Sequence, residues 1–517
     1  MQISSEFTTL PDLLRVRAQA APDAPFVQYM GRSFSYGEFD ARTDDLAAGL
    51  AGLGVAPGDV VSVFLPNCLE FLEAWWAILK AGGVLGPVNP AYVGPEASYV
   101  IGHAEAVALV TDERGAGVIE PHREELAGLR HVISIDSGGD VRLDELAGTG
   151  RATPEPGRGL DDLASILYTS GTTGKPKGAM LTHRNLLVNT TQGAELVPLG
   201  PGERVGMILP LFHANAQVAT TLIPMMIGCE IVMWERFSAS KFWDTVAELR
   251  PVTISAVPTI LAAVLNAPNA PTDGNSMRYV ICGAAPLSVE LLQAFQDRFG
   301  IRILEGYGLT ETGCIASINP FYGERKVGSI GLPLRGEEMR IVGEGGEVAD
   351  AGGYGEIIIR GANVMPGYLK NPDATAESIR DGWLYTGDIG YMDEDGYFYI
   401  VDRSKDMIIR GGENIYPREI EEVIYEHASV LECAVIGIPH EVRGEEVMAI
   451  VVAKPGAQLD LDELAAFAAQ RLAKYKLPAR FELLDELPKT PTGKISKGPL
   501  RDQYGSWTTQ HQSQAPA

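Results

Sequence analysis

The segment Tyr168–Gly178 contains the residue types needed to bind a phosphate chain. It reads Tyr-Thr-Ser-Gly-Thr-Thr-Gly-Lys-Pro-Lys-Gly. Its glycines let backbone N–H groups approach phosphate oxygens, its hydroxyl side chains add donors, and Lys175 adds a positive charge. It is not a Walker P-loop, because only two residues separate Gly171 from Gly174 and Pro176 stands where a Ser or Thr is needed. A flexible Gly/Thr turn is the alternative, but this combination of residues favours a nucleotide site.

Five further motifs are spaced along the rest of the chain. They are Gly306-Tyr-Gly-Leu-Thr-Glu-Thr312, Tyr385-Thr-Gly-Asp388, Val401-Asp-Arg-Ser-Lys-Asp406, Gly411-Gly-Glu-Asn414 and Pro491-Thr-Gly-Lys494. With the phosphate loop, they stand in the order found in the adenylate-forming superfamily of acyl-CoA synthetases, peptide adenylation domains and firefly luciferase. The chain resembles this family from Phe7 to Arg501, and it is most similar to CoA ligases of medium-chain, aryl and carnitine-like acids.

The resemblance implies a nucleotide site built from separate segments. The phosphate loop would comprise Thr169, Ser170, Gly171, Thr172, Thr173, Gly174 and Lys175. Tyr307 would stack on adenine, since an aromatic face can hold any base, and Asp388 and Arg403 would hold the ribose hydroxyls. Other nucleotide contacts would come from Gly283, Ala284, Ala285, Glu305, Gly306, Gly308 and Ile400. Taken singly, each of these residues could equally lie in a turn or on the surface.

By the same resemblance, four residues would carry the adenylation chemistry. Lys494 would neutralise the charge that develops when the carboxylate attacks the α-phosphorus and pyrophosphate leaves. Thr310 would bond a phosphate oxygen, and Glu311 would bind Mg²⁺, a hard cation that prefers oxygen ligands. His213 would position the acyl carboxylate, although a lone His is more often a core residue. The alternative for Lys494 is a solvated lysine in an exposed segment.

The resemblance further implies that the C-terminal domain moves between two half-reactions. Lys405 matches the hinge position, and a few linker residues can absorb a domain rotation. After adenylation, the rotation would withdraw Lys494 and present the loop Gly411–Gly412 to the pantetheine channel. A plain domain linker is the alternative.

The residues that would surround the acyl group are small or polar. The pocket wall would include Ala214, Asn215, Ala219, Val257 and Cys314, together with Ala284 and Gly308. Asn215 could hydrogen-bond a polar substituent of the acid or satisfy backbone groups. No charged residue stands where it would anchor an amino group, which weakens the case for amino-acid activation.

The apolar pattern predicts an α/β protein of two domains. Strand-like runs such as Val60–Leu65 alternate with helical patterns such as Phe71–Ala81, and Gly138–Gly159 is interpreted as a surface connection. We expect a large N-terminal AMP-binding domain at 1–403 that includes a β-rich subdomain from Val327 to Tyr399. A small mobile α+β domain follows at 404–503, and residues 504–517 are expected to be disordered.

Composition and charge exclude several other classes of protein. With 45% hydrophobic and 21% charged residues, the chain is typical of globular proteins, and its longest apolar runs are shorter than a membrane span. The formal charge of -25 argues against nucleic acid as a partner. Five scattered cysteines and an N-terminus unlike a signal peptide predict a cytoplasmic protein without a zinc site.

The sequence therefore predicts an AMP-forming acid:CoA ligase that uses ATP, Mg²⁺ and CoA. A carrier-protein thiol or another nucleophile is the alternative acceptor, although no carrier domain is appended. A nucleotide-binding regulator without catalysis is disfavoured because Lys494, Glu311 and the phosphate loop are all present, and a luciferase-like oxidation is a remote option. The sequence leaves open which small carboxylic acid is used, the pathway and the oligomeric state.

Overall fold

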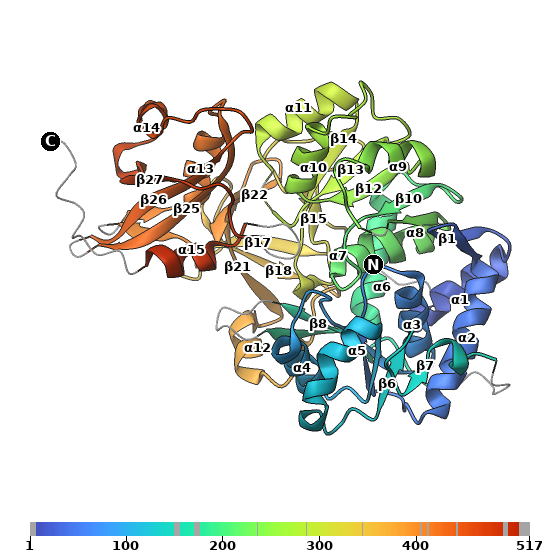
Figure 1. Ribbon diagram of the computed structural model, residues 1–517. Coiled ribbons are helices and arrows are strands. Elements are labelled where there is room, and N and C mark those ends of the chain that lie inside the picture. Colours follow the sequence, from blue (N-terminus) through green and yellow to red (C-terminus); the bar gives the residue numbers. More distant parts are fainter. Residues whose placement is uncertain are drawn as a thin grey trace.

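The computed structural model describes residues 7–148, 156–169, 176–234, 236–285, 287–343, 345–403, 406–410, 413–440, 443–489 and 495–505. Figure 1 shows a large part, coloured blue to yellow, and a smaller C-terminal part in orange and red beside it. The helices are α1 (Leu10–Ala20), α2 (Tyr36–Gly52), α3 (Leu69–Lys80), α4 (Gly94–His103), α5 (Glu113–Ile119), α6 (His183–Leu196), α7 (Ala214–Gln217), α8 (Ile223–Ile227), α9 (Phe242–Leu249), α10 (Pro258–Leu265), α11 (Val289–Phe299), α12 (Pro372–Ser378), α13 (Pro417–Tyr425), α14 (Leu461–Ala469) and α15 (Lys497–Tyr504). No helix in these ranges is long and apolar enough to cross a membrane.

Two mixed sheets form the body of the large part. The first is nine-stranded over the described residues, in the order β16-β15-β14-β13-β12-β10-β11-β1-β2. Its strands are β1 (Pro25–Tyr29), β2 (Arg32–Ser35), β10 (Arg204–Met207), β11 (Glu230–Met233), β12 (Thr253–Ala256), β13 (Tyr279–Cys282), β14 (Arg302–Tyr307), β15 (Ser317–Ile318) and β16 (Leu332–Pro333). Neighbouring strands are parallel from β14 through β13, β12, β10 and β11 to β1, as expected for alternating strands and helices.

The second sheet is eight-stranded in the part of the chain that is described, in the order β19-β9-β8-β4-β3-β5-β6-β7. Its strands are β3 (Val60–Phe64), β4 (Val84–Pro87), β5 (Ala108–Thr111), β6 (His131–Ser134), β7 (Val141–Arg142), β8 (Leu163–Thr169), β9 (Lys177–Thr182) and β19 (Gly367–Tyr368). Strand β8 pairs antiparallel with β9, so the predicted phosphate loop connects the two strands of a hairpin.

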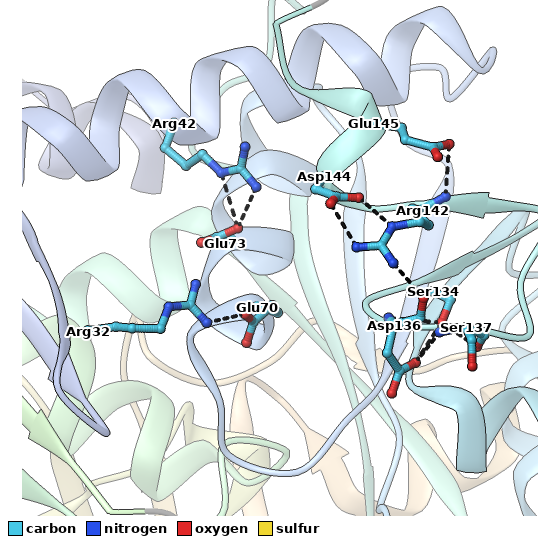
Figure 2. A network of polar contacts seen from close by, with 10 residues as sticks. All are labelled: Arg32, Arg42, Glu70, Glu73, Ser134, Asp136, Ser137, Arg142, Asp144 and Glu145. Atoms are coloured by element: carbon cyan, nitrogen blue, oxygen red, sulfur yellow. Dashed lines mark hydrogen bonds and ion pairs between the residues drawn. The ribbon is translucent and has the colours of Figure 1, made fainter.

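Helix α3 lies in the core of the large part. Trp75 and Trp76 are fully buried and belong to one apolar cluster with residues of both sheets, and a helix that is apolar on nearly all sides needs such a position. Its few charged residues are paired. Glu73 accepts two hydrogen bonds from Arg42 of α2 at 3.3 Å, and Glu70 pairs with Arg32 of β2 at 2.6 Å (Figure 2).

The predicted surface connection from Gly138 to Gly159 is partly wrong. It contains strand β7 and a 3-10 turn at Asp144–Leu146, and the Leu143 and Leu146 side chains are buried. Arg142 pairs with Asp144 and donates to the carbonyl of Asp136 (Figure 2). These local contacts stabilise a strand and a turn that the apolar pattern of the sequence did not predict.

A third sheet confirms the predicted β-rich subdomain. Its strands are β17 (Glu338–Val342), β18 (Gly355–Arg360), β20 (Ile379–Arg380), β21 (Trp383–Met392) and β22 (Phe398–Arg403), and all their pairings are antiparallel. Its apolar face packs on Tyr307 at the end of β14. The subdomain therefore reaches the edge of the first sheet.

The C-terminal part contains a sheet that is buried on both faces. Its strands are β23 (Ile408–Arg410), β24 (Glu413–Ile415), β25 (Val430–His440), β26 (Gly444–Ala453) and β27 (Arg480–Leu483). Alternate residues of β25 and β26 enter two apolar clusters, one shared with α13 and α14 and the other with α15, because successive strand side chains point to opposite faces. Tyr504 ends α15 and is buried, so its assignment to a disordered tail is wrong, and residues 506–517 lie outside the described residues.

Glu337 is a buried carboxyl group in the large part. Its two carboxyl oxygens are buried, and so are Oε1 of Gln192 and Oδ1 of Asn363. These oxygens receive no hydrogen bond from the described residues. Burial raises the pKa of Glu337 to about 9, and its contacts with Asn363 and Gln192 oppose this rise only in part. A protonated carboxyl group can donate to an amide oxygen and a carboxylate cannot, so Glu337 is uncharged in the native protein at neutral pH.

Replacement of Glu337 by Gln should stabilise the protein at alkaline pH. The pKa of Glu337 is higher in the native protein than in the unfolded chain, so this group makes the wild-type protein less stable as the pH rises from about 4.5 to about 9. The amide of a glutamine does not titrate. The thermal midpoint of the Glu337→Gln variant, relative to that of the wild type, should therefore rise between pH 5.5 and pH 8.5. Parallel midpoint curves for the two proteins would contradict a buried neutral Glu337.

Candidate active site

Most of the predicted site residues of the large part follow the carboxyl ends of neighbouring parallel strands. Val257 follows β12, Gly283 follows β13, and Tyr307 is the last residue of β14. His213 comes shortly after β10, which pairs with β12. Parallel strands end at one edge of their sheet, where ligands of open α/β sheets bind. The fold thus brings four sequence-predicted segments to one edge.

The loops at this edge approach each other closely. A Cβ atom on Gly308 would lie 1.7 Å from the carbonyl oxygen of Cys314, and one on Gly283 would lie 2.6 Å from that of Gly306. Ala284 has a φ of 70°, which is costly for a residue with a side chain and is concentrated at functional sites. Only glycine fits at 283 and 308, and the predicted adenine slot is a tightly packed surface.

Tyr307 connects this edge to the β-rich subdomain. Its hydroxyl donates a 2.5 Å hydrogen bond to Oδ2 of Asp388 in β21, and the Asp388 side chain is buried. Arg403 lies opposite Asp388 in the register of β21 and β22, and Ile400 of β22 packs on the cluster that contains Tyr307. The proposed adenine and ribose residues are therefore adjacent, although they come from two sheets.

Glu311 is held by a residue that the sequence analysis missed. Thr310 and Glu311 lie in a 3-10 turn, and Tyr368 donates its hydroxyl to Oε1 of Glu311 at 2.7 Å. Burial, and then the charge of Glu311, raise the pKa of Tyr368, so its hydroxyl keeps the proton that it donates. The hydrogen bond therefore fixes the orientation of the Glu311 carboxylate. No local pattern marked Tyr368, because its partner is 57 residues away.

Glu305 lies between the site and the C-terminal part. Its side chain is 5% exposed, and burial raises its pKa to about 7, against the opposing charge of Arg418 in α13. Glu422, one turn further along the same helix, adds to the rise. Glu305 is therefore near its titration point at neutral pH, and the two charged groups that shift its pKa, Arg418 and Glu422, belong to the C-terminal part.

A cavity of about 500 Å³ opens beside the predicted acyl site. Its wall is mainly apolar and includes Leu209, Phe212, Phe237, Val257 and Ile260, with the exposed Arg236 also in the lining. Val257 was predicted for the acyl pocket, whereas the cavity lining does not include the predicted Ala214, Asn215, Ala219 and Cys314. Pockets of this size and character hold small-molecule ligands.

The chain after His213 forms an irregular helix. A π-helical turn at Val218–Leu222, which contains Ala219, separates α7 from α8, and such turns are frequent at functional sites. His213 packs against Phe212, with ring centroids 4.0 Å apart. Oδ1 of Asn215 is buried and accepts no hydrogen bond from the described part of the chain, so this oxygen does not satisfy a backbone group.

Several predicted site residues lie outside the described residues. They are Ser170, Gly171, Thr172, Thr173, Gly174, Lys175, Lys405, Gly411, Gly412 and Lys494. Their neighbours are described. Thr169 pairs with Lys177 across the hairpin, and Lys489 forms a β-bridge with Ile495. Backbone pairing therefore holds the described residues that flank the phosphate loop and the Pro491–Lys494 motif.

Comparison with known proteins assigns this arrangement to a family. Residues 14–369 match the model of the AMP-binding enzymes, and residues 419–494 match that of the AMP-binding enzyme C-terminal domain. The chain belongs to the family of AMP-binding enzymes. Within it, the chain is an ATP-dependent acid:CoA ligase of the AMP-forming type, as the sequence predicted.

The similar proteins differ in the acids that their names give. The chain is 39% identical to a sulfoacetate–CoA ligase of Cupriavidus necator, over 95% of this chain and 97% of the relative. It is 38% identical to a feruloyl-CoA synthase of Amycolatopsis, over 95% and 98%. The ATP-bound structure of MatB from Rhodopseudomonas palustris aligns with a TM-score of 0.89 at 33% identity, over 96% and 99% of the two chains. An anthranilate CoA ligase with bound anthranoyl-AMP aligns with a TM-score of 0.91 at 26% identity, over 98% and 99%.

Replacement of Tyr307 by Phe should destabilise the protein. The change removes a donor to the buried Asp388 carboxylate, which costs about 1–3 kcal/mol of unfolding free energy. Tyr322→Phe is the matched control, because Tyr322 is 77% exposed. Urea unfolding should give a lower midpoint for Tyr307→Phe only. Equal midpoints would show that the hydrogen bond contributes nothing to stability.

Proposed function

We propose that this enzyme activates a carboxylic acid with an apolar or aromatic acyl group of moderate size and transfers it to CoA. The observation that supports this is the mainly apolar cavity of about 500 Å³ next to Phe212 and Val257. Burial of apolar surface contributes about 25 cal/mol per Å². A second anionic group of the acid would lose its hydration in such a cavity. Arg236 also lines the cavity, but it is exposed, so its positive charge remains in contact with solvent.

In the first half-reaction, the acid carboxylate attacks the α-phosphorus of ATP and pyrophosphate leaves. We assign adenine to Tyr307 and its neighbouring loops, the ribose to Asp388 and Arg403, and the triphosphate to Thr169–Lys175. Thr310 would bond a phosphate oxygen, and Oε2 of Glu311 would hold Mg²⁺, which neutralises phosphate charge when bound. The hydrogen bond from Tyr368 supports this role, because it orients the Glu311 carboxylate.

Lys494 is proposed to supply the mobile positive charge of this step. The described residues on each side of the Pro491–Lys494 motif form ion pairs within the C-terminal part. Lys489 pairs with Glu432 of β25 at 2.6 Å, and Lys497 pairs with Glu421 of α13 at 2.8 Å. Both ends of the segment that carries Lys494 are therefore anchored to the C-terminal sheet and helix, and the lysine would move with the domain as one body.

In the second half-reaction, the CoA thiol attacks the acyl-adenylate and AMP leaves. We propose that the C-terminal domain, residues 404–503, rotates about Lys405 and brings Gly411 and Gly412 to the thiol route. The electrostatic influence of Arg418 in α13 on the buried Glu305 supports an interface between the two parts that includes charged groups. His213 would position the acyl group of the acyl-adenylate for attack.

The site of action is proposed to be the cytoplasm. All five cysteines are free thiols, which suits a reducing compartment. CoA is the proposed acceptor, because the relatives that match along the length of the chain are named as CoA ligases or synthases.

A panel of acids tests the proposed substrate class. Ferulate, octanoate, sulfoacetate and oxalate would each be supplied with ATP, Mg²⁺ and CoA, and AMP and thioester followed by mass spectrometry. We expect ferulate or octanoate to exceed the two small dianions by at least about tenfold in kcat/KM, because only they fill an apolar cavity. Preference for sulfoacetate or oxalate would contradict the proposed acyl group while leaving the ligase activity intact.

Replacement of Lys494 by Ala should separate the two half-reactions. Acid-dependent pyrophosphate exchange should fall by about 100-fold or more, because a charge that stabilises the transition state is lost. Thioester formation from a preformed acyl-adenylate should persist. Lys454→Ala is the matched control, because Lys454 is an exposed lysine of the same domain, and it should retain both activities. Equal loss of both half-reactions in Lys494→Ala would refute this division of roles.

A further inference from the structure

Two side chains of α4 contact the chain on both sides of the phosphate loop. Nδ1 of His103 lies 2.8 Å from the hydroxyl oxygen of Tyr168, near the end of β8. The hydroxyl of Tyr99 donates to the carbonyl oxygen of Pro176, at the start of the return strand, at 3.3 Å. Helix α4 therefore touches both ends of the hairpin connection that holds residues 170–175.

Tyr99 and His103 act together because of their spacing. They stand at positions i and i+4 of α4 and thus on one face of the helix. Their rings stack with centroids 5.5 Å apart and planes inclined by 25°. The two polar contacts are made by one rigid pair of rings, and both entry and exit of the loop are fixed relative to the same helix.

The hydrogen bond between His103 and Tyr168 joins two uncharged groups. Burial raises the pKa of Tyr168, so its hydroxyl keeps its proton. Burial, and then the charge of Lys370, lower the pKa of His103, so the ring is neutral at pH 7. A neutral imidazole has one donating and one accepting nitrogen, and a phenol hydroxyl can donate or accept, so Nδ1 of His103 can bond Tyr168 in either tautomer.

The same helix end is connected to the segment that holds Glu311. The ammonium group of Lys370 donates to the carbonyl oxygen of His103 at 3.0 Å and pairs with Glu105 at 2.8 Å. The neighbouring Leu369 donates its N–H to the carbonyl oxygen of Gly178 in β9 at 2.8 Å. Because Tyr368 bonds Glu311, the contacts run without interruption from α4 through 368–370 to the proposed magnesium ligand.

We propose that Tyr99 and His103 are positioning residues for ATP, which hold the two ends of the phosphate loop at a fixed place relative to α4 and Glu311. The inference rests on the proposed assignment of Thr169–Lys175 to the triphosphate. Ordering a loop costs conformational entropy at the moment of binding, and anchors that reduce this cost in advance increase affinity. Neither side chain needs to touch ATP for this effect.

A set of three variants tests the proposal with a ligand-specific readout. His103→Ala removes the hydrogen-bond partner of Tyr168, His103→Asn places an amide group near the position of Nδ1, and Tyr99→Phe removes only the hydroxyl. Binding of MgATP would be measured by calorimetry without acid or CoA, alongside KM for ATP, acid and CoA. We expect His103→Ala to weaken ATP binding by about tenfold and Tyr99→Phe by about threefold, with KM for acid and CoA within about twofold, and His103→Asn to recover most of the loss.

The control is His122→Ala, because His122 lines the same surface groove as His103 but makes its polar contact with Glu125. It should bind ATP like the wild type. An unchanged ATP affinity in His103→Ala would overturn the proposal. So would a rise in all three KM values in proportion to a fall in thermal midpoint, which would indicate a merely structural role. Wild-type protein that binds no ATP would instead refute the proposed nucleotide site itself.

Discussion

Parallel pairing of β10, β12, β13 and β14 is the constraint on which the rest of the site depends. It makes the strands end at one edge, and it delivers segments that are far apart in the chain to one surface. The close approach of Gly308 to Cys314 and the left-handed Ala284 follow from this crowding. A reaction between two anions, a carboxylate and a triphosphate, needs donors held in place beforehand, and a rigid sheet edge provides that support.

Tyrosine hydroxyl groups join the elements around this edge. Tyr307 bonds Asp388, Tyr368 bonds Glu311, and Tyr168 meets His103. Each bond connects different secondary-structure elements, because a phenol reaches far, buries an apolar ring and still carries a polar end. Burial keeps the phenols of Tyr168 and Tyr368 protonated. The carboxylate proposed to hold Mg²⁺ is therefore oriented by a donor that remains uncharged.

Buried carboxyl groups in this protein behave differently because their neighbours differ. Burial raises the pKa of Glu337 to about 9, whereas the charge of Arg418 in the C-terminal part opposes the effect of burial on Glu305, which has a pKa of about 7. Asp388 accepts a hydrogen bond from Tyr307. The group with a near-neutral pKa is the one at the contact between the two parts, where its environment would change most if they separated.

The sequence by itself determined the fold class, the β-rich subdomain and the order of the motifs, because apolar periodicity and Gly-rich spacing are local properties of the chain. It predicted roles for Tyr307, Asp388 and Glu311 one residue at a time. Only the tertiary structure decided that Tyr307 bonds Asp388, that Tyr368 holds Glu311 and that the apolar cavity lies against Val257. These facts depend on strand register and on side chains that meet across long separations in the chain, and a linear pattern carries no signal for either.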